Sequence, residues 1–232
     1  MAKHIGIVAC SAEGAALCFR EIAAYGGERM GEHLHPQVTL SCIAMGEWLP
    51  AFDSGDYRGV AQFMLRETRL VAQAGAQLAI CPDNSAHLAY EYVIAESPIP
   101  WLHIAEEVAK AAARKGYRHA ALLGTRYTMT GHVYPQMFAK HGVRITSPSA
   151  ADQKIVDDII FQELVKGVFT EASRLQYNEA IARLKAQGCD CVVLGCTEIP
   201  LLVREDDCPL PTLDSTRLLA RAAVDAALES KP

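Results

Sequence analysis

The chain has 232 residues, of which 50% are hydrophobic and 21% are charged, a balance typical of a globular protein with apolar cores. The formal net charge is −5, and without a basic stripe to neutralise phosphates we expect no nucleic-acid partner. No apolar stretch approaches the ~20 residues that cross a bilayer. The first residues run into a predicted strand without a signal-peptide pattern, so we expect a cytoplasmic protein with no membrane partner.

Short β-rich runs alternate with longer segments of helical periodicity along the chain. The predicted strands are residues 4–9, 37–43, 78–81, 119–123, 143–146, 191–194 and 211–213. The predicted helices are residues 13–24, 57–74, 85–95, 104–115, 126–141, 153–166 and 173–187, with a last helix from residue 214 to about 230. This alternation predicts an α/β fold with parallel strands, right-handed crossovers and helices on both faces.

Two strand-to-helix turns share one design, 113 positions apart (196 minus 83). In each, an apolar run ends at a rigid or small residue, Pro82 or Gly195, and a side chain that can exchange a proton follows, Asp83 or Cys196. We therefore predict two similar Rossmann-like lobes with parallel sheets, related by pseudo-two-fold duplication. The predicted lobes are residues 1–98 plus 214–232 and residues 99–213. Because ligands collect at the carboxyl ends of parallel strands, we expect the active site between the lobes, at the two turns.

Cys196 is the first candidate catalytic residue. At the start of a helix its thiol would feel the positive helix end, which favours a thiolate that can act as a base or nucleophile. The alternative is a buried structural cysteine. Asp83 is the second candidate, although an N-cap role at a helix start would also explain it. As a base, a carboxylate is weaker than a thiolate by about 4 to 5 pKa units, roughly 6 kcal/mol.

Short polar side chains near the turns are candidate substrate ligands. Asn84, Ser85 and Thr197 could form a carboxylate cradle at two helix starts, although capping explains them equally well. Thr125 could add a third polar wall, with ordinary loop chemistry as the alternative. His87, one helical turn after Asp83, could orient that residue or contact substrate. Ser11 lies in a small polar loop that matches neither a P-loop nor G-x-G-x-x-G, so nucleotide binding is disfavoured.

The chain has eight cysteines, which we expect to be reduced in a chain of this length without an export signal. Cys10, Cys18, Cys42 and Cys208 are interpreted as small buried hydrophobes or incidental. The pair Cys189 and Cys191 lacks a second pair at zinc-finger spacing. The sequence therefore predicts no metal site.

At the two turns the chain resembles the aspartate/glutamate racemase superfamily, whose members work without pyridoxal phosphate. The second signature of the family is matched by Gly195-Cys196-Thr197-Glu198-Ile199, and the first appears as Asp83-Asn84-Ser85-Ala86-His87. Supporting similarity lies in residues 122–129, 159–164 and 169–174, and it spans essentially the whole chain.

The resemblance implies two lobes with a site between them, a homodimer and no cofactor. Family members use two cysteines: one thiolate removes the α-proton, and the opposite thiol reprotonates the carbanion. By position, Cys196 is the second of these cysteines and Asp83 replaces the first, while Asn84, Ser85 and Thr197 match carboxylate-binding positions. Relatives selective for acidic substrates hold the distal carboxylate with basic residues. Residues 44–57 contain none, and Ile155 falls where a lysine is expected, so a substrate with a neutral side chain fits.

The leading hypothesis is an isomerase: a cofactor-independent racemase or epimerase of an amino acid or related small carboxylate, with Cys196 and Asp83 on opposite faces of the α-carbon. One alternative is a cofactor-free decarboxylase of the arylmalonate type, in which Cys196 alone protonates the product. Against it, the Asp83 carboxylate would repel a dianionic substrate. Another alternative is a non-catalytic protein that binds a small acid.

Overall fold

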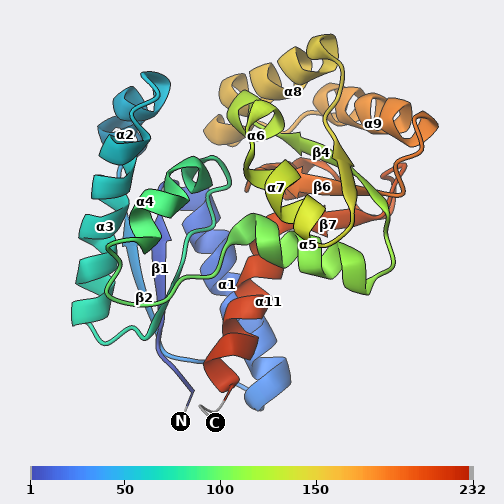
Figure 1. Ribbon diagram of the computed structural model, residues 1–232. Helices are drawn as coiled ribbons and strands as arrows, with labels where there is room; N and C mark the ends of the chain where they lie inside the picture. The colour runs from blue at the N-terminus through green and yellow to red at the C-terminus, as the bar shows by residue number, and fades with distance from the viewer. Residues whose placement is uncertain (1, 230–232) are drawn as a thin grey trace. The chain divides into compact units, whose positions relative to one another are not determined.

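The computed structural model describes residues 2–229 and divides into two compact units. Unit 1 runs to Ile104 and resumes at Thr216, and unit 2 is Ala105–Ser215 (Figure 1). Each unit is a parallel α/β layer structure, so the predicted fold class is confirmed. No described helix is long and apolar enough to cross a membrane.

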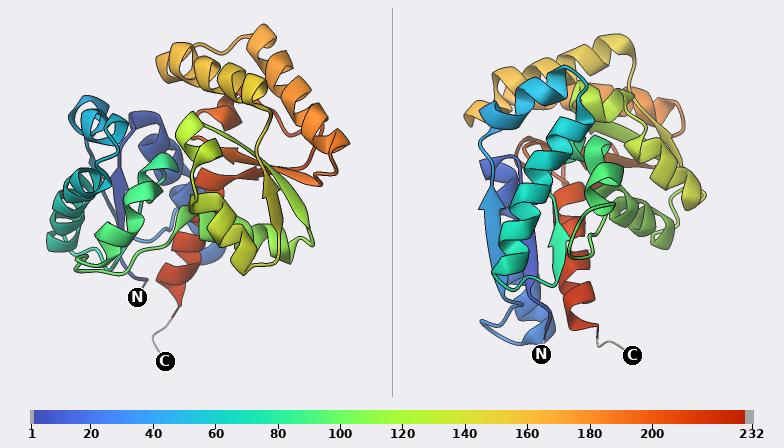
Figure 2. Two further views of the ribbon diagram at one scale, coloured as in Figure 1. Left: turned by 45° about the horizontal axis from the view of Figure 1, so that its top comes forward. Right: turned by 60° about the vertical axis from the view of Figure 1, so that its left-hand side comes forward.

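Unit 1 contains a parallel three-stranded sheet in the order β2-β1-β3, formed by Val38–Cys42, Ile5–Ala9 and Leu78–Ile80. Alternate residues of β1 face one core, where they meet apolar side chains of α1 (Ala12–Met30) and α11 (Ser215–Leu228). Helix α3 (Tyr57–Gln73) covers the other face, as the right-hand view of Figure 2 shows. It lies so close that a Cβ on Gly6 of β1 would come within 2.6 Å of the Val71 side chain.

Three further elements complete unit 1: α2 (Met45–Asp53), the 3-10 helix η1 (Ser85–Ala89) and α4 (Tyr90–Ile94). The Pro-rich segment after α4 stays with this unit because it runs beside β3. Ala79 donates its N–H to the Pro100 carbonyl, and its own carbonyl accepts from Leu102. This pairing explains why the unit changes after Ile104, whereas the sequence placed the boundary after residue 98.

Unit 2 contains a parallel four-stranded sheet in the order β5-β4-β6-β7. Its strands are Arg144–Thr146, His119–Gly124, Cys191–Gly195 and Thr212–Asp214. Helices α8 (Ala150–Gln162) and α9 (Glu171–Ala186) bury apolar side chains against β4 and β6. The remaining elements are α5 (Ile104–Arg114), α6 (Arg126–Thr130), α7 (Val133–Lys140), η2 (Leu164–Lys166) and α10 (Ile199–Leu202).

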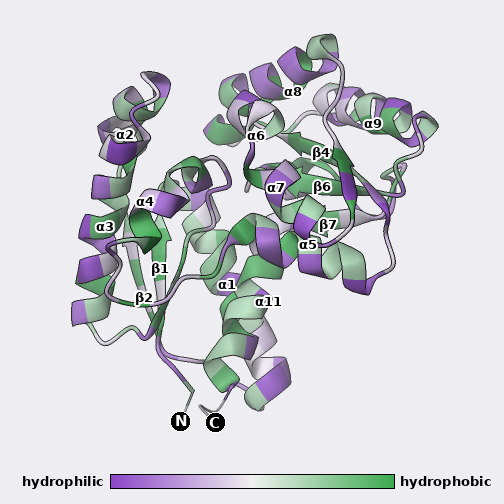
Figure 3. Cartoon of the chain, viewed as in Figure 1, coloured by the Kyte–Doolittle hydropathy of each residue, from purple (hydrophilic) through white to green (hydrophobic). Residues whose placement is uncertain are grey.

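Hydropathy follows the layers in both units (Figure 3). The central strands are almost wholly apolar and buried along their length, as strands covered on both faces by helices must be. The helices carry an apolar side and a polar side, so α3, for example, buries Met64 and Leu65 while Leu70 and the charged residues of its other face stay outside.

A repeated polar contact supports the duplication of the two units. His4, just before β1, bonds through Nε2 to Thr39 at 2.9 Å, and His119, at the start of β4, bonds in the same way to Thr146 at 2.8 Å. The main-chain N–H of each histidine donates to the side chain before the next central strand, Gln77 in unit 1 and Asp190 in unit 2. The same hydrogen-bond network therefore lies at the start of each unit. Asp83 follows β3 and Cys196 follows β6, and these two strands correspond to each other in the two units.

Candidate functional site

The structure describes two groups of predicted site residues, one in each unit. Both groups lie just after the carboxyl ends of parallel strands, where the chain leaves the sheet and turns into the next helix. The group in unit 1 contains Ser11, Asp83, Asn84, Ser85 and His87. The group in unit 2 contains Thr125, Cys196 and Thr197.

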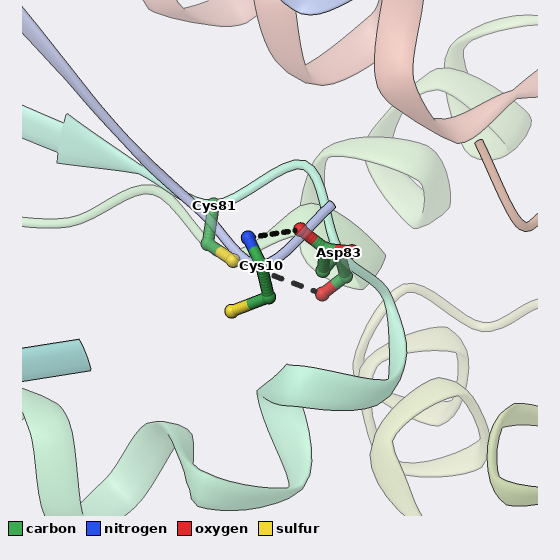
Figure 4. Close-up of side chains that lie close together, drawn as sticks. All are labelled: Cys10, Cys81 and Asp83. Atoms are coloured by element: carbon green, nitrogen blue, oxygen red, sulfur yellow. Dashed lines mark hydrogen bonds between the residues drawn. The ribbon is translucent and has the colours of Figure 1, made fainter. Parts of the chain in front are cut away.

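Asp83 is tied to the end of the neighbouring strand. Its Oδ2 accepts a hydrogen bond from the main-chain N–H of Cys10 at 2.8 Å (Figure 4), and Cys10 directly follows β1. The N-cap position of η1 is occupied by the buried Asn84, whose side chain makes no capping bond. Asn84, rather than Asp83, therefore stands at the N-cap position of η1. Ser85 is half-buried at the first position of η1.

His87 is buried and holds the main chain of Asp83. Its Nδ1 lies 2.9 Å from the Asp83 carbonyl, and its Nε2 accepts from the N–H of Ile104 at 3.2 Å. Because a carbonyl only accepts, Nδ1 carries the proton. Burial, and then the nearby His103 ring at 4.8 Å, lower the pKa of His87 well below its usual value. The neutral ring uses both nitrogens on main-chain groups, which favours the positioning role over direct contact with substrate.

Ser11 occupies the N-cap position of the 19-residue helix α1 without making a side-chain capping bond. Its Oγ is buried and has no hydrogen-bond partner among the described residues. A buried hydroxyl without a partner is uncommon because it costs free energy. A hydroxyl at a helix N-terminus is suited to an anionic group, and the role of Ser11 as a substrate ligand stays a prediction.

Two thiols lie beside Asp83. One ligand atom each from Cys10, Cys81 and Asp83 lie within 4.8 Å of one another, as Figure 4 shows. Cys10 and Cys81 are fully buried, as expected of small hydrophobes. The hydrogen bond with Cys81 and burial, followed by the charges of Cys81, Asp83 and Cys42, raise the pKa of Cys10 well above its usual value. The sequence interpretation of Cys10 as a small buried hydrophobe or incidental agrees with its burial but did not include these neighbours, because only the fold brings residues 10 and 81 together.

Cys196 follows β6 directly, and its thiol donates a hydrogen bond to Glu198 Oε2 at 3.0 Å. The Thr197 hydroxyl donates to the same oxygen at 2.7 Å. All three side chains are buried. The predicted helix start is different: α10 has four residues and begins at Ile199, with Glu198 in the N-cap position. The Cys196 sulfur thus contacts the Glu198 carboxylate and, contrary to the sequence prediction, does not stand at the N-terminus of a long helix.

Glu198 is the functional candidate that sequence reasoning missed. In the sequence it is part of the matched family signature, and the signal that marks it is an acidic residue two positions after a candidate catalytic cysteine. A carboxylate that is only 4% exposed needs hydrogen-bond partners to offset the cost of its burial, and here a thiol and a hydroxyl supply them.

The site residues of unit 2 are positioned by the ends of β4 and β6, which approach each other closely. Gly124 and Gly195 are register partners on β4 and β6, and a Cβ on Gly195 would lie 2.9 Å from the Leu123 carbonyl oxygen. The next residues, Thr125 and Cys196, are thereby brought to the same edge. Thr125 caps α6 by accepting from Thr128 N–H at 3.3 Å, which is the loop chemistry weighed as its alternative role.

The chain is a duplicated α/β protein with two parallel units. In each unit a side chain that can exchange a proton, Asp83 or Cys196, follows the corresponding strand. A family model described as Asp/Glu/Hydantoin racemase matches residues 5–223. The chain belongs to this family.

Solved structures of high similarity agree with the assignment. The chain is 32% identical to a putative Asp/Glu racemase from Yersinia pestis, with a TM-score of 0.89 and coverage of 98% of this chain and 100% of that one. It is 26% identical to PH1733, an aspartate racemase homologue from Pyrococcus horikoshii, with a TM-score of 0.83 and coverage of 99% and 100%.

Curated relatives are more distant. The broad specificity amino-acid racemase RacX of Bacillus subtilis is 22% identical over 160 residues, which is 67% of this chain and 67% of the relative. The glutamate racemase of Listeria innocua is 28% identical over 149 residues, so the match spans about half of that enzyme, 54% of its length.

Proposed function

We propose that the chain is a cofactor-independent amino-acid racemase in which Cys196 and Asp83 exchange protons with the α-carbon of the substrate. The observation that carries this proposal is the buried hydrogen bond from the Cys196 thiol to Glu198. It gives the sulfur a base that can hold its proton. At the corresponding position of unit 1, Asp83 is a carboxylate with a main-chain donor.

The contacts are compatible with one assignment of resting protonation states. We assign the proton between Cys196 Sγ and Glu198 Oε2, which lie 3.0 Å apart, to the sulfur, and we assign Asp83, which accepts from a main-chain N–H, as an ionised carboxylate. The opposite arrangement, thiolate with protonated aspartate, is disfavoured by about 6 kcal/mol for isolated groups. The resting enzyme thus has one base, Asp83, and one acid, Cys196.

From this state the reaction proceeds in two proton transfers. Asp83 takes the α-proton, and the electron pair of the broken C–H bond remains on the substrate as an enolate-like carbanion. The Cys196 thiol then gives its proton to the opposite face of that carbon, which inverts the configuration. Asp83 is left protonated and Cys196 is left as a thiolate. The other enantiomer reacts through the reverse sequence, which starts from this second state, with Cys196 as thiolate and Asp83 protonated. Between turnovers the two states interconvert when each group exchanges one proton with solvent, and Glu198 can carry the proton to or from Cys196.

Polar groups of both units are proposed to hold the substrate carboxylate. In unit 1 these are Ser11, whose buried hydroxyl lacks a partner among the described residues, together with Asn84 and Ser85. In unit 2 the candidate is Thr197. The absence of a basic residue from positions 44–57 favours an amino acid with a neutral side chain, as does the broad specificity of the Bacillus subtilis relative.

The test is incubation of single enantiomers of a broad panel of amino acids in deuterium oxide. We expect inversion with deuterium at the α-carbon for one or more neutral amino acids. Absence of both inversion and exchange across the panel would contradict racemisation. Release of carbon dioxide from substituted malonates would instead indicate the decarboxylase, and ligand binding without any turnover would indicate the binding protein.

A further inference from the structure

The thiols of Cys10 and Cys81 and the Asp83 carboxylate form a compact set of potential metal ligands in unit 1. One ligand atom of each lies within 4.8 Å of the other two, and Figure 4 shows the three side chains together at the ends of β1 and β3. The donors come from two loops that the parallel pairing of β1 with β3 holds next to each other.

These spacings suit a four-coordinate metal ion. At metal–sulfur distances of about 2.3 Å, two sulfur ligands of a tetrahedral site lie about 3.8 Å apart. The three ligand atoms would need to close by no more than about 1 Å to meet this geometry. Two thiolates and one carboxylate leave the fourth position for water or another small ligand, as in sites with three protein ligands.

Hydrogen bonds hold the ligand-bearing residues in place. Only weak ones use a sulfur atom, such as that from Cys81 Sγ to the Asp83 carbonyl at 4.0 Å. The Cys10 N–H donates to Asp83 Oδ2 at 2.8 Å, and the Cys10 carbonyl accepts from Trp48 Nε1 at 3.2 Å. An ionised carboxylate has two oxygens and about four lone-pair sites. Asp83 can therefore keep its main-chain bond and also bind a metal ion, and such outer bonds are what orient metal ligands.

Charge selects the kind of ion. Two thiolates and a carboxylate at these distances repel one another strongly in a buried place, and a divalent cation offsets that repulsion. Thiolate ligands select soft or borderline ions rather than magnesium or calcium. We propose that Cys10, Cys81 and Asp83 form a binding site for a thiophilic divalent cation of the zinc and cadmium class, which the sequence alone did not predict.

Metal binding at this site would also inactivate the enzyme, and this consequence rests on the proposed function. A metal-bound Asp83 carboxylate no longer accepts the α-proton. Zinc would then act as a stoichiometric inhibitor that a chelator reverses. Binding itself requires no racemase activity, so a spectroscopic test of binding separates failure of the metal site from failure of the proposed reaction.

The experiment is a titration of the full-length, reduced and metal-free protein with cadmium, followed by the ultraviolet thiolate-to-cadmium charge-transfer band. We expect a band that saturates at one equivalent. Cys10→Ser and Cys81→Ser should each weaken binding by at least about 100-fold, since loss of even outer-shell partners costs about 10- to 100-fold. Cys42→Ser is the matched control, since Cys42 ends the adjacent strand β2 but lies outside the cluster, and it should change affinity less than about twofold.

An unchanged titration in both Cys10→Ser and Cys81→Ser, or an equal loss in Cys42→Ser, would overturn the site. Should the buried serine variants fail to fold, cadmium NMR of the wild-type protein gives the answer directly. A resonance in the range of two-sulfur coordination supports the site. A resonance of an oxygen-only or nitrogen-only environment, or no tightly bound cadmium, contradicts it.

Discussion

The Cys196 thiol and the Glu198 carboxylate form a buried hydrogen-bonded pair, with 3.0 Å between Sγ and Oε2. Thr197 donates to the same oxygen and holds the carboxylate in place. The proposed reaction needs Cys196 both as a thiol and as a thiolate, and Glu198 is the group to which its proton would move. Glu198 is therefore expected to act through Cys196 as a positioning residue and proton acceptor.

Replacing Glu198 with glutamine should lower racemase turnover on the order of 100-fold, the scale of losing one proton-transfer partner. The amide keeps the size of the side chain but cannot take the thiol proton. Steady-state kinetics should show the loss in kcat, with KM little changed. Glu198→Asp, which retains a carboxylate, should recover part of the activity, and the exposed Glu205→Gln should behave as wild type. Equal loss in all three variants would mean that the effect is not specific to this carboxylate.

Asp83→Cys should raise racemisation, because a second thiol removes the energetic mismatch between the two proton-exchange groups. The turnover numbers of the two directions should also become more alike. Their kcat/KM values must remain equal, since the two free enantiomers have the same energy. Measuring kcat and KM from each pure enantiomer checks this expectation. Unchanged or lower activity would indicate chemistry that depends on the carboxylate itself.

Ser11→Ala should weaken substrate binding without a loss of stability. Removing one hydrogen bond to a substrate carboxylate costs about 1 kcal/mol, or about fivefold in KM. The folded protein loses no hydrogen bond among the described residues, because the Ser11 hydroxyl is buried and unpaired there, so urea unfolding should show equal or higher stability. A destabilised variant with unchanged KM would assign Ser11 a structural role instead.

His87 should make the stability of unit 1 sensitive to acid. Its folded-state pKa lies well below the usual value, chiefly through burial, so below about pH 6.5 the unfolded chain binds a proton that the folded one does not. Stability should therefore fall as the pH drops, by up to about 1.4 kcal/mol per pH unit. His87→Gln should reduce this slope in denaturant unfolding at several pH values. The exposed His33→Gln is the control, and identical slopes in all three proteins would contradict the assignment.

Much of the fold could be predicted from the sequence because buried parallel strands carry a strong local signal. All seven predicted strands are observed within a residue or two at each end. Helix α2 (Met45–Asp53) was not predicted, and Pro50 inside it explains why. The predicted helix over residues 126–141 is two helices, α6 and α7, separated at Gly131.

The candidate site was predictable only in part, because its contacts join residues that are distant along the chain. The turns that carry Asp83 and Cys196 follow from local pattern. The bond from Cys10 to Asp83 spans 73 positions and depends on the pairing of β1 with β3. The partner of Cys196 was close in sequence, but only the structure shows that the Glu198 side chain turns back toward the sulfur.

The most direct test of the central claim is α-proton exchange in deuterium oxide by two single variants, each given each pure enantiomer. Cys196→Ala retains Asp83 as its base, and Asp83→Asn retains Cys196 with Glu198. We predict that both variants lose inversion and that each exchanges the α-proton of a different enantiomer. Exchange of the same enantiomer by both variants, or full racemisation by either, would show that Cys196 and Asp83 are not the two opposed proton-transfer groups.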